Sequence, residues 1–210
     1  MGNDYYILED GEQTGPYTFE ELTDLAPDIH TRVMSPNADA WQDACDLPEL
    51  YPYFEAQGIY LPTGDNLASF GWRLLAYIID YVIYSILMQY TLVILASMGI
   101  AFKLGSINDL FKMPVMQVLQ LQLIYSFVII VYNSTCEASA MKGSVGKRIF
   151  KLVVVDVDGQ SLSYINALLR SIGKALSIFF VYTGFISILF TEHRQAFHDY
   201  LAKTYVVKRD

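Results

Sequence analysis

One aspartate most constrains what this chain can fold into. Asp80 is the only charged residue between Leu74 and Phe102, and this stretch exceeds the roughly 20 apolar residues that a transmembrane helix needs. Arg73 stands directly before it. A carboxylate at membrane depth is costly, so such groups face a bundle interior or a wet cavity and often mark functional sites. The sequence therefore predicts a membrane helix that turns Asp80 inward, towards a guanidinium group.

Charge is divided unevenly along the chain. Up to Asn66 there are fourteen Asp and Glu against one Arg, whereas the remainder has thirteen Lys and Arg against eight acids. With 53% hydrophobic residues, this division predicts an acidic soluble region joined to a membrane region. The acidic balance of the soluble part makes nucleic acid an unsuitable partner. The first residues lack a basic and apolar signal peptide, so we expect the acidic region to stay in the cytoplasm.

The residue types needed for metal binding or catalysis are sparse. Cys45 and Cys136 are the only cysteines and lie in different regions, so both are interpreted as structural thiols. His193 and His198 are five positions apart, which is not the spacing of a helical zinc pair. The sequence also lacks a recognisable combination of nucleophile, base and oxyanion donors. We therefore predict no metal, no cofactor and no enzymatic activity.

The first region, residues 1–55, is predicted to be a small α+β domain. Residues 5–8 and 31–34 have the composition of short strands. Thr18 and Glu21 have the spacing of a capping box at the start of a short helix. Residues 56–66 contain Gly58, Pro62 and Gly64, which predicts a linker. The expected contributors to the small core are Trp41, Leu47 and Leu50.

Residues 67–210 are predicted to form a membrane α-helical bundle with a short β-hairpin on its cytoplasmic face. The loop before residue 149 is rich in basic residues, which places it on the cytoplasmic side of the membrane. Two β-branched runs, 149–156 and 204–209, are expected to pair outside the hydrocarbon layer. The stretch 175–190 is short and flanked by basic residues, which leaves open a re-entrant hairpin or a third crossing. The predicted helices are 67–102, 113–137, 163–181 and 184–202.

Polar side chains recur at helical spacing in the predicted membrane segments. Arg73, Tyr77 and Asp80 follow positions i, i+4 and i+7, so they share one helix face. Such a cluster is either a path for a proton or small monovalent cation through Asp80, or an ion-pair network that fixes how the helices pack. Both interpretations remain open. The predicted cluster consists of Arg73, Tyr77, Asp80, Glu137, Arg170, Arg194 and Asp199.

The N-terminal region resembles the bacterial GYF-like domain. The resemblance is carried by Tyr5-Tyr6, by Gly15-Pro16-Tyr17 followed by Glu20-Glu21-Leu22, and by Trp41. Related GYF domains bind proline-rich peptides on an aromatic surface, a mode suited to the polyproline conformation. The same aromatics are equally compatible with the core of a small fold. The candidate peptide-binding residues are Tyr5, Tyr6, Gly15, Pro16, Tyr17, Phe19 and Trp41.

The remainder of the chain, about 67–207, resembles the RDD membrane family through four motifs in order. RDD proteins are named for one arginine and two aspartates, which correspond here to Arg73, Asp80 and Asp199. One departure is Ser144-Val145, where the family usually has Thr-Pro before Gly-Lys-Arg. The motifs lie at residues 70–80, 144–156, 168–170 and 194–204.

The RDD resemblance implies a multi-pass protein of the bacterial cell (inner) membrane. Some members are reported as cation/proton antiporters, and others look like accessory membrane proteins. We expect a non-enzymatic protein whose GYF-like domain recruits a partner, with the bundle acting as a membrane platform or moving a small solute. The alternative is a cation/proton antiporter that works through Asp80. Because the bundle has few helices with which to enclose a pathway, a homo-oligomer is also expected.

Overall fold

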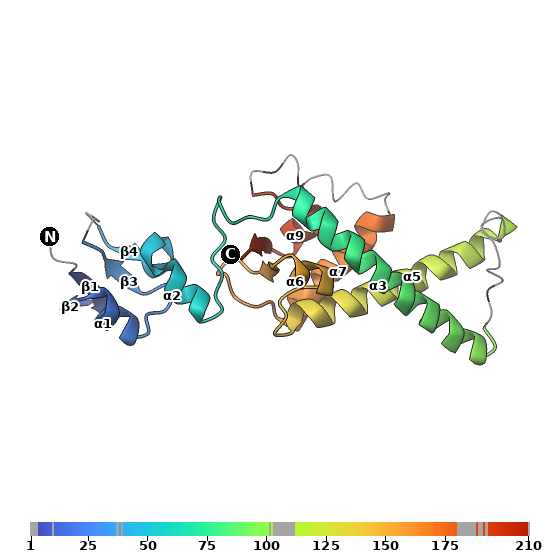
Figure 1. The fold of residues 1–210 in the computed structure, drawn as a ribbon, viewed down its shortest axis with the longest axis horizontal. Helices are drawn as coiled ribbons and strands as arrows, with labels where there is room; N and C mark the ends of the chain where they lie inside the picture. Colours follow the sequence, from blue (N-terminus) through green and yellow to red (C-terminus); the bar gives the residue numbers. More distant parts are fainter. Residues whose placement is uncertain are drawn as a thin grey trace. The chain divides into compact units, whose positions relative to one another are not determined.

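The computed structural model describes residues 4–9, 11–36, 38, 40–100, 102, 112–179, 188, 191 and 193–209. The chain divides into two compact units. Unit 1 comprises Met1–Leu61 together with Asp158–Gln160, and unit 2 comprises Pro62–Val157 and Ser161–Asp210. Each unit has its own hydrophobic core, and Figure 1 shows the helices and strands of both units.

Unit 1 is a four-stranded antiparallel sheet with short helices. Its strand order is β2-β1-β3-β4, and its core includes Leu22, Val33, Leu50 and Phe54. The Thr18–Glu21 capping box is confirmed, since the Thr18 side chain accepts from the Glu21 amide and the Glu21 carboxylate from the Thr18 amide. The elements are β1 (Tyr5–Glu9), β2 (Glu12–Tyr17), α1 (Phe19–Asp24), β3 (Arg32–Met34), β4 (Gln42–Asp43), η1 (Ala44–Asp46), η2 (Pro48–Leu50) and α2 (Tyr51–Ala56).

Two elements of unit 1 were not expected from the sequence. Gly15, Pro16 and Tyr17 lie within edge strand β2 rather than in a loop that leads into α1. The chain can turn into β2 because Gly11 has a φ of +84°, a backbone conformation that glycine adopts without steric cost. Helix α2 occupies the end of the predicted domain, where Phe54 is fully enclosed by the core.

Unit 2 contains two long apolar helices, α3 and α5, packed against shorter elements (Figure 1). Helix α5 packs mainly on α7, whereas α3 packs mainly on α6. The hydrophobic core of unit 2 includes Ala76, Leu152, Leu162 and Val206. The elements are α3 (Phe70–Ser97), α5 (Val115–Ala138), α6 (Val145–Ile149), β5 (Leu152–Val155), α7 (Tyr164–Phe179), α9 (Phe197–Leu201) and β6 (Tyr205–Lys208).

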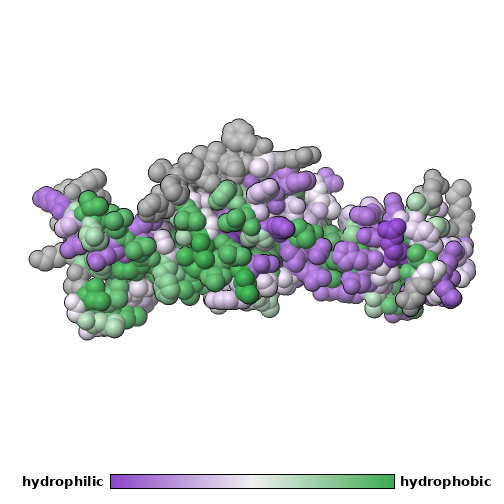
Figure 2. All heavy atoms as spheres, turned by 180° about the vertical axis from the view of Figure 1, so that it is seen from behind, coloured by the Kyte–Doolittle hydropathy of each residue, from purple (hydrophilic) through white to green (hydrophobic). Residues whose placement is uncertain are grey.

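Helices α3 and α5 are long and apolar enough to cross a bilayer, and few of the side chains in their apolar stretches are buried. Figure 2 shows a predominantly hydrophobic surface on this part of unit 2. A soluble protein rarely exposes an apolar patch of this extent. Helix α3 ends earlier than predicted, because Gly99 has a φ of +86° and the Ile100 amide donates to the Leu95 carbonyl. This is the Schellman arrangement, which closes a helix.

The two predicted β-branched runs pair in the structure. Strands β5 and β6 are antiparallel, with Val153 opposite Val207. The chain just before α3 extends this pair, since the Ala68 amide donates to the Val206 carbonyl and the Lys208 amide to the Asn66 carbonyl. The start and end of unit 2 are therefore fastened together.

Two predicted boundaries in unit 2 are wrong. The polar loop before residue 149 contains helix α6, which begins because the Ser144 side chain caps it at the Lys147 amide. The predicted helix 184–202 is not helical at residues 193–196, where Arg194 has a φ of +47°, and α9 forms its described C-terminal part. Residues 180–187, 189 and 190, on which the choice between a hairpin and a third crossing depends, lie outside the described part of the chain.

Candidate functional site: a buried polar network in unit 2

Asp80 lies on the buried face of α3 and holds the start of α6. Its carboxylate accepts hydrogen bonds from the Ser144 hydroxyl at 2.5 Å, the Gly146 amide at 2.9 Å and the Tyr132 hydroxyl at 3.2 Å. Only 3% of the residue is exposed, so the predicted inward orientation is confirmed. The predicted guanidinium partner is wrong. Three uncharged donors satisfy the carboxylate instead, two of them at the beginning of α6, where helices leave N–H groups unpaired.

Gly146 makes the contact between Asp80 and α6 possible. A Cβ atom at this position would meet the backbone carbonyl of Ala76 and lie 3.0 Å from the carboxyl carbon of Asp80. Only a residue without a side chain allows α6 to approach α3 this closely. The Val145 amide adds a further connection by donating to the Tyr132 hydroxyl at 3.1 Å.

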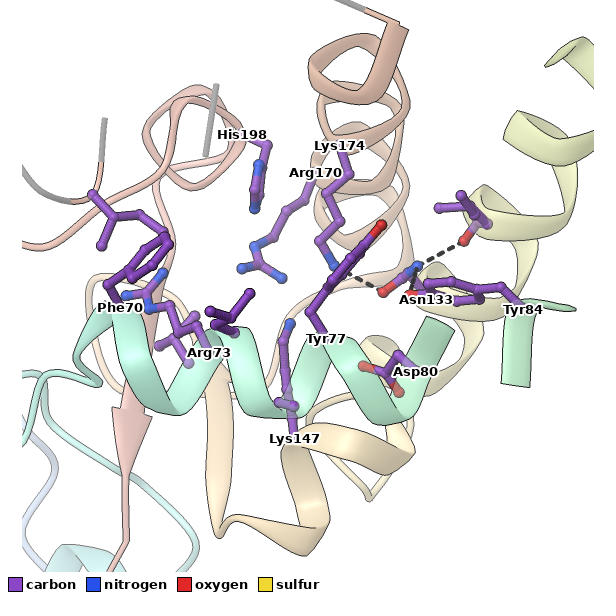
Figure 3. A pocket seen from close by; sticks show the side chains of 15 residues that line it. Phe70, Arg73, Tyr77, Asp80, Tyr84, Asn133, Lys147, Arg170, Lys174 and His198 are labelled. Atoms are coloured by element: carbon purple, nitrogen blue, oxygen red, sulfur yellow. Dashed lines mark hydrogen bonds between the residues drawn. The ribbon is translucent and has the colours of Figure 1, made fainter. Parts of the chain in front are cut away.

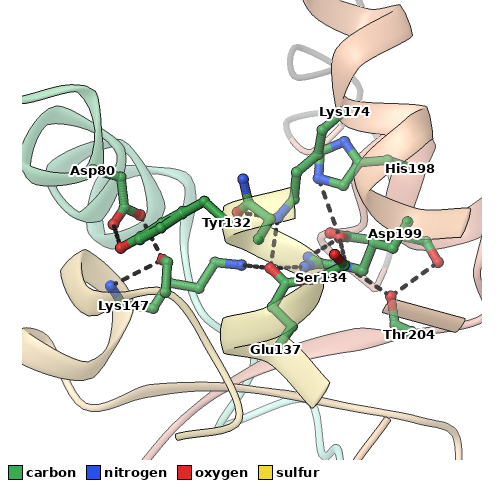
Figure 4. A network of polar contacts seen from close by, with 12 residues as sticks. Asp80, Tyr132, Ser134, Glu137, Lys147, Lys174, His198, Asp199 and Thr204 are labelled. Carbon is green, nitrogen blue, oxygen red and sulfur yellow. Dashed lines mark hydrogen bonds and ion pairs between the residues drawn. The ribbon is translucent and has the colours of Figure 1, made fainter. Parts of the chain in front are cut away.

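Arg170, on α7, is the centre of a second, buried cluster. Figure 4 labels its partners Glu137, Asp199 and Thr204. Its Nη1 donates to Oε1 of Glu137 at 2.6 Å. Its Nε donates to Oδ1 of Asp199 at 3.0 Å, and Nη2 pairs with the same carboxylate. The guanidinium also donates to the Thr204 hydroxyl at 3.1 Å. One planar side chain therefore joins α5, α7 and the segment around α9, a role that suits the fixed fork of arginine donors.

Glu137 forms ion pairs with two further basic side chains. The Nζ atoms of Lys147 and Lys174 lie 2.7 and 2.5 Å from its Oε1, and Lys174 also donates to the side chain of Asn133 at 2.9 Å. The sequence places Lys147 in the basic loop that fixes membrane orientation and does not predict this contact. Its position in the cluster follows from α6, which turns the side chain towards α5.

Asp199 connects Arg170 to Arg73 at the start of α3. Arg73 Nη1 lies 2.5 Å from Oδ2 of Asp199, and the Ala196 amide donates to the same oxygen at 3.1 Å. Burial alone would raise the pKa of Asp199, but the adjacent Arg170 guanidinium holds that pKa well below its usual range. Burial also lowers the pKa of His198 well below its usual range. The carboxylate is therefore ionised at neutral pH, whereas His198 is neutral.

The other two members of the predicted cluster have different positions. Arg194 donates to the backbone carbonyl of Leu67 at 2.8 Å and forms no ion pair with a carboxylate among the described residues. Tyr77 lies among aromatic rings on α3, with its centroid 6.5 Å from those of Tyr81 and Tyr84. The structure thus divides the predicted cluster into the Asp80 contact, the Arg170 network, Arg194, and Tyr77, which lines a cavity together with Asp80 and Arg170.

A cavity of about 310 Å³ lies between α3, α5 and α7. Figure 3 shows Arg170 and Lys174 descending from α7 towards α3, with Lys147 approaching from α6. Asp80 and Arg73 also belong to the wall. Apolar side chains such as Phe70 and Ile129 complete it. The buried network and the cavity therefore share Arg73, Lys147, Arg170 and Lys174, whereas Glu137 and Asp199 are not among the lining residues.

The predicted peptide-binding residues of unit 1 separate into two groups. Tyr5, Tyr17 and Phe19 pack against the domain core, and the rings of Tyr5 and Phe19 meet edge to face. Tyr6 instead lies on the opposite side of β1, because Tyr5 and Ile7 point inward. A Cβ atom on Gly15 would lie 2.9 Å from the Tyr6 ring, so the ring packs directly over the glycine.

Tyr6 begins a row of partly exposed side chains across the outer face of the sheet. It pairs with Met34 on β3. The β3–β4 register pairs Val33 with Gln42, and Trp41 directly precedes Gln42 at the end of this pair where Met34 follows Val33. All three are partly exposed, and Pro16 beside Gly15 is exposed. We call this surface the aromatic row: Tyr6, Met34, Trp41 and Pro16.

Comparisons with known proteins follow the same division. The model of the RDD family matches residues 67–203, and that of GYF domain 2 matches residues 5–50. The protein named "Uncharacterized protein YxaI" from Bacillus subtilis (strain 168) is 33% identical over 146 residues, which cover 67% of this chain and 96% of that protein. No solved structure matches the chain.

Proposed function

The chain belongs to the RDD family, and from this premise we propose that it is a non-enzymatic protein of the bacterial cytoplasmic membrane. In this proposal, the GYF-like unit 1 recruits a protein partner and unit 2 is the membrane platform to which that partner is brought. The observation that carries the proposal is the aromatic row, a partly exposed apolar surface on a domain tied to two bilayer-length helices.

The membrane assignment is supported by the surface of α3 and α5. Large apolar side chains face outward on both helices, including Val82, Val93, Leu123 and Phe127. In the proposed topology, the two helices cross the bilayer and return the chain to its starting side. The exposed Arg148 and the half-buried Lys142 then lie in the cytoplasm, in agreement with the preference of basic residues for that side. Unit 1 lies on the same side.

The recruitment role is supported by the shape and chemistry of the aromatic row. Aromatic grooves bind proline-rich segments because the polyproline conformation is already extended and loses little entropy on binding. Tyr6 and Trp41 present rings on one face of a hydrogen-bonded sheet, and rigid aromatic side chains of this kind dominate many interfaces. We therefore propose that the partner presents a proline-rich segment.

Replacing Tyr6 or Trp41 by alanine should weaken binding of a proline-rich peptide. We expect each change to raise the dissociation constant about tenfold, which corresponds to roughly 1.4 kcal/mol. The measurement is titration of a fluorescent proline-rich peptide with the full-length protein in detergent. Leu25→Ala is the matched control, because Leu25 is an exposed apolar residue of unit 1 outside the row. Equal affinity of all three variants and wild type would contradict the role of the row.

A second candidate function, cation/proton exchange, is favoured by one observation: Asp80 is part of the cavity wall. Two observations oppose it. Three hydrogen-bond donors already occupy the carboxylate, and the guanidinium groups of Arg73 and Arg170 belong to the same wall. Arginine is permanently charged, so a cation that enters the cavity meets repulsion. We therefore rank exchange below recruitment.

Asp80→Asn separates the two functions. The variant keeps the shape of the side chain and an oxygen for the Gly146 amide, so we expect it to fold. If unit 2 is a platform, vesicles containing wild-type protein should show no sodium- or potassium-dependent proton flux above protein-free vesicles, and the variant should behave identically. The measurement uses a pH-sensitive dye inside the vesicles. A wild-type flux that disappears in Asp80→Asn would establish the exchanger and remove the platform proposal.

A further inference from the structure

Three potential metal ligands of unit 1 are brought together by backbone hydrogen bonds between two segments. The Cys45 amide donates to the Ile29 carbonyl at 3.0 Å, and the Ala44 amide donates to the Thr31 carbonyl at 2.9 Å. This antiparallel arrangement continues into the β3–β4 pair. As a result, His30 lies close to Asp43 and Cys45, although they are 13 and 15 positions further along the sequence.

The distances between these ligand atoms suit a shared ion. One donor atom from each of His30, Asp43 and Cys45 lies within 4.8 Å of the others, and Nδ1 of His30 is 4.0 Å from Oδ2 of Asp43. Donors on one tetrahedral zinc ion lie roughly 3.3–3.8 Å apart, given bond lengths of about 2.0–2.3 Å. The remaining gap is closed by small side-chain rotations, and the exposed ring of His30 is free to make them.

The surroundings orient two of these ligands. Arg32 holds Oδ1 of Asp43 at 3.1 Å, which leaves Oδ2 directed at His30. The other ring nitrogen of His30, Nε2, lies 4.0 Å from Asp158, in the segment that belongs to unit 1. A carboxylate opposite the coordinating nitrogen is the usual arrangement around a metal-bound histidine, because it fixes the ring and its tautomer.

The charge of unit 1 also favours a cation. Up to Asn66 the chain has fourteen acidic residues and a single arginine, so its field attracts divalent ions. Thiolate, imidazole and carboxylate together are the ligand types that bind Zn²⁺, and three protein ligands leave a fourth position for water or another group.

We propose that unit 1 binds one transition-metal ion of the zinc type through His30, Asp43 and Cys45. The proposal is independent of the function suggested above, because the ligands are separate from the aromatic row and from unit 2. It departs from the expectation that the chain holds no metal, which rested on ligand spacing along the sequence. That spacing could not show contacts made by the sheet.

Cobalt titration of the full-length protein tests the proposal. In reduced, chelator-treated protein in detergent, Co²⁺ should bind one to one and produce a thiolate-to-cobalt charge-transfer band, which Zn²⁺ then removes. Cys45→Ser should abolish the band. His30→Ala should weaken binding by more than the roughly 10- to 100-fold that loss of a ligand's hydrogen-bond partner costs.

The chain offers a matched control for each variant. Cys136→Ser and His193→Ala alter the same residue types in unit 2, and both should keep the band and the stoichiometry. The circular dichroism spectrum of Cys45→Ser should equal that of wild type. This result would exclude unfolding as the reason why the charge-transfer band is lost. Absence of the band in wild type at saturating Co²⁺ would overturn the proposal. So would a band that persists in Cys45→Ser and disappears in Cys136→Ser.

Discussion

Replacing Arg170 by methionine is expected to destabilise unit 2 by about 3–5 kcal/mol, the usual cost of removing one partner of a buried ion pair. Arg170 is 1% exposed and is hydrogen-bonded to both Glu137 and Asp199, neither of which has any exposed surface. Without the guanidinium, Asp199 depends on Arg73 and Glu137 depends on lysines. The measurement is thermal or denaturant unfolding of the purified protein in detergent.

Two further variants define the origin of this effect. Arg148→Met is the matched control, because Arg148 is an exposed cation on α6, and a change there should stay within about 0.5 kcal/mol. Arg170→Lys keeps the charge but removes the planar fork that reaches two carboxylates, so this variant should lose an intermediate amount of stability. Stability of Arg170→Met within about 0.5 kcal/mol of wild type would show that the network does not hold unit 2 together.

Gly146→Ala is expected to have the second large effect. The added methyl group would overlap the Ala76 backbone carbonyl and press on the Asp80 carboxylate. Overpacking of a well-packed interior typically costs 1–3 kcal/mol, occasionally more, and here displacement of α6 would also break the hydrogen bonds to Asp80. We therefore expect a loss of roughly 3 kcal/mol in the free energy of unfolding.

Gly71→Ala is the appropriate comparison for Gly146→Ala. Gly71 lies in the first turn of α3, and the nearest atom to an added Cβ is the Ser69 hydroxyl at 4.0 Å. Alanine favours helix more than glycine does, by up to about 1 kcal/mol, so this variant should be neutral or slightly stabilised. Equal stability of the two alanine variants in the same unfolding assay would mean that α6 does not need its close approach to α3.

The inward position of Asp80 was predictable from the sequence, because solvation alone forbids a bare carboxylate against lipid. Its partners were not predictable. They depend on α6, whose only local signal is Ser144 in a glycine-containing loop, and on the approach that Gly146 permits. The pairing of β5 with β6 followed from their β-branched composition.

Other features of both units could not be predicted from the sequence for a similar reason. The family resemblance pointed to Arg73, Asp80 and Asp199 without showing that Arg73 pairs with Asp199 while Asp80 contacts α6. In unit 1, aromatic composition did not reveal that Tyr5 faces the core and Tyr6 the surface. Such assignments require the strand register, which a single sequence specifies only after the sheet partners are known.

The fastening of Asn66–Ala68 to β6 has a consequence for how the protein is made. Arg73 leaves the ribosome early, yet its carboxylate partner Asp199 is 126 positions downstream, and β6 follows later still. Both apolar helices are therefore synthesised before the residues that form ion pairs with their buried charged side chains. Maturation of unit 2 is consequently completed only once β6 has been synthesised, and premature termination just short of β6 would remove the strand that holds β5 and the segment before α3 together.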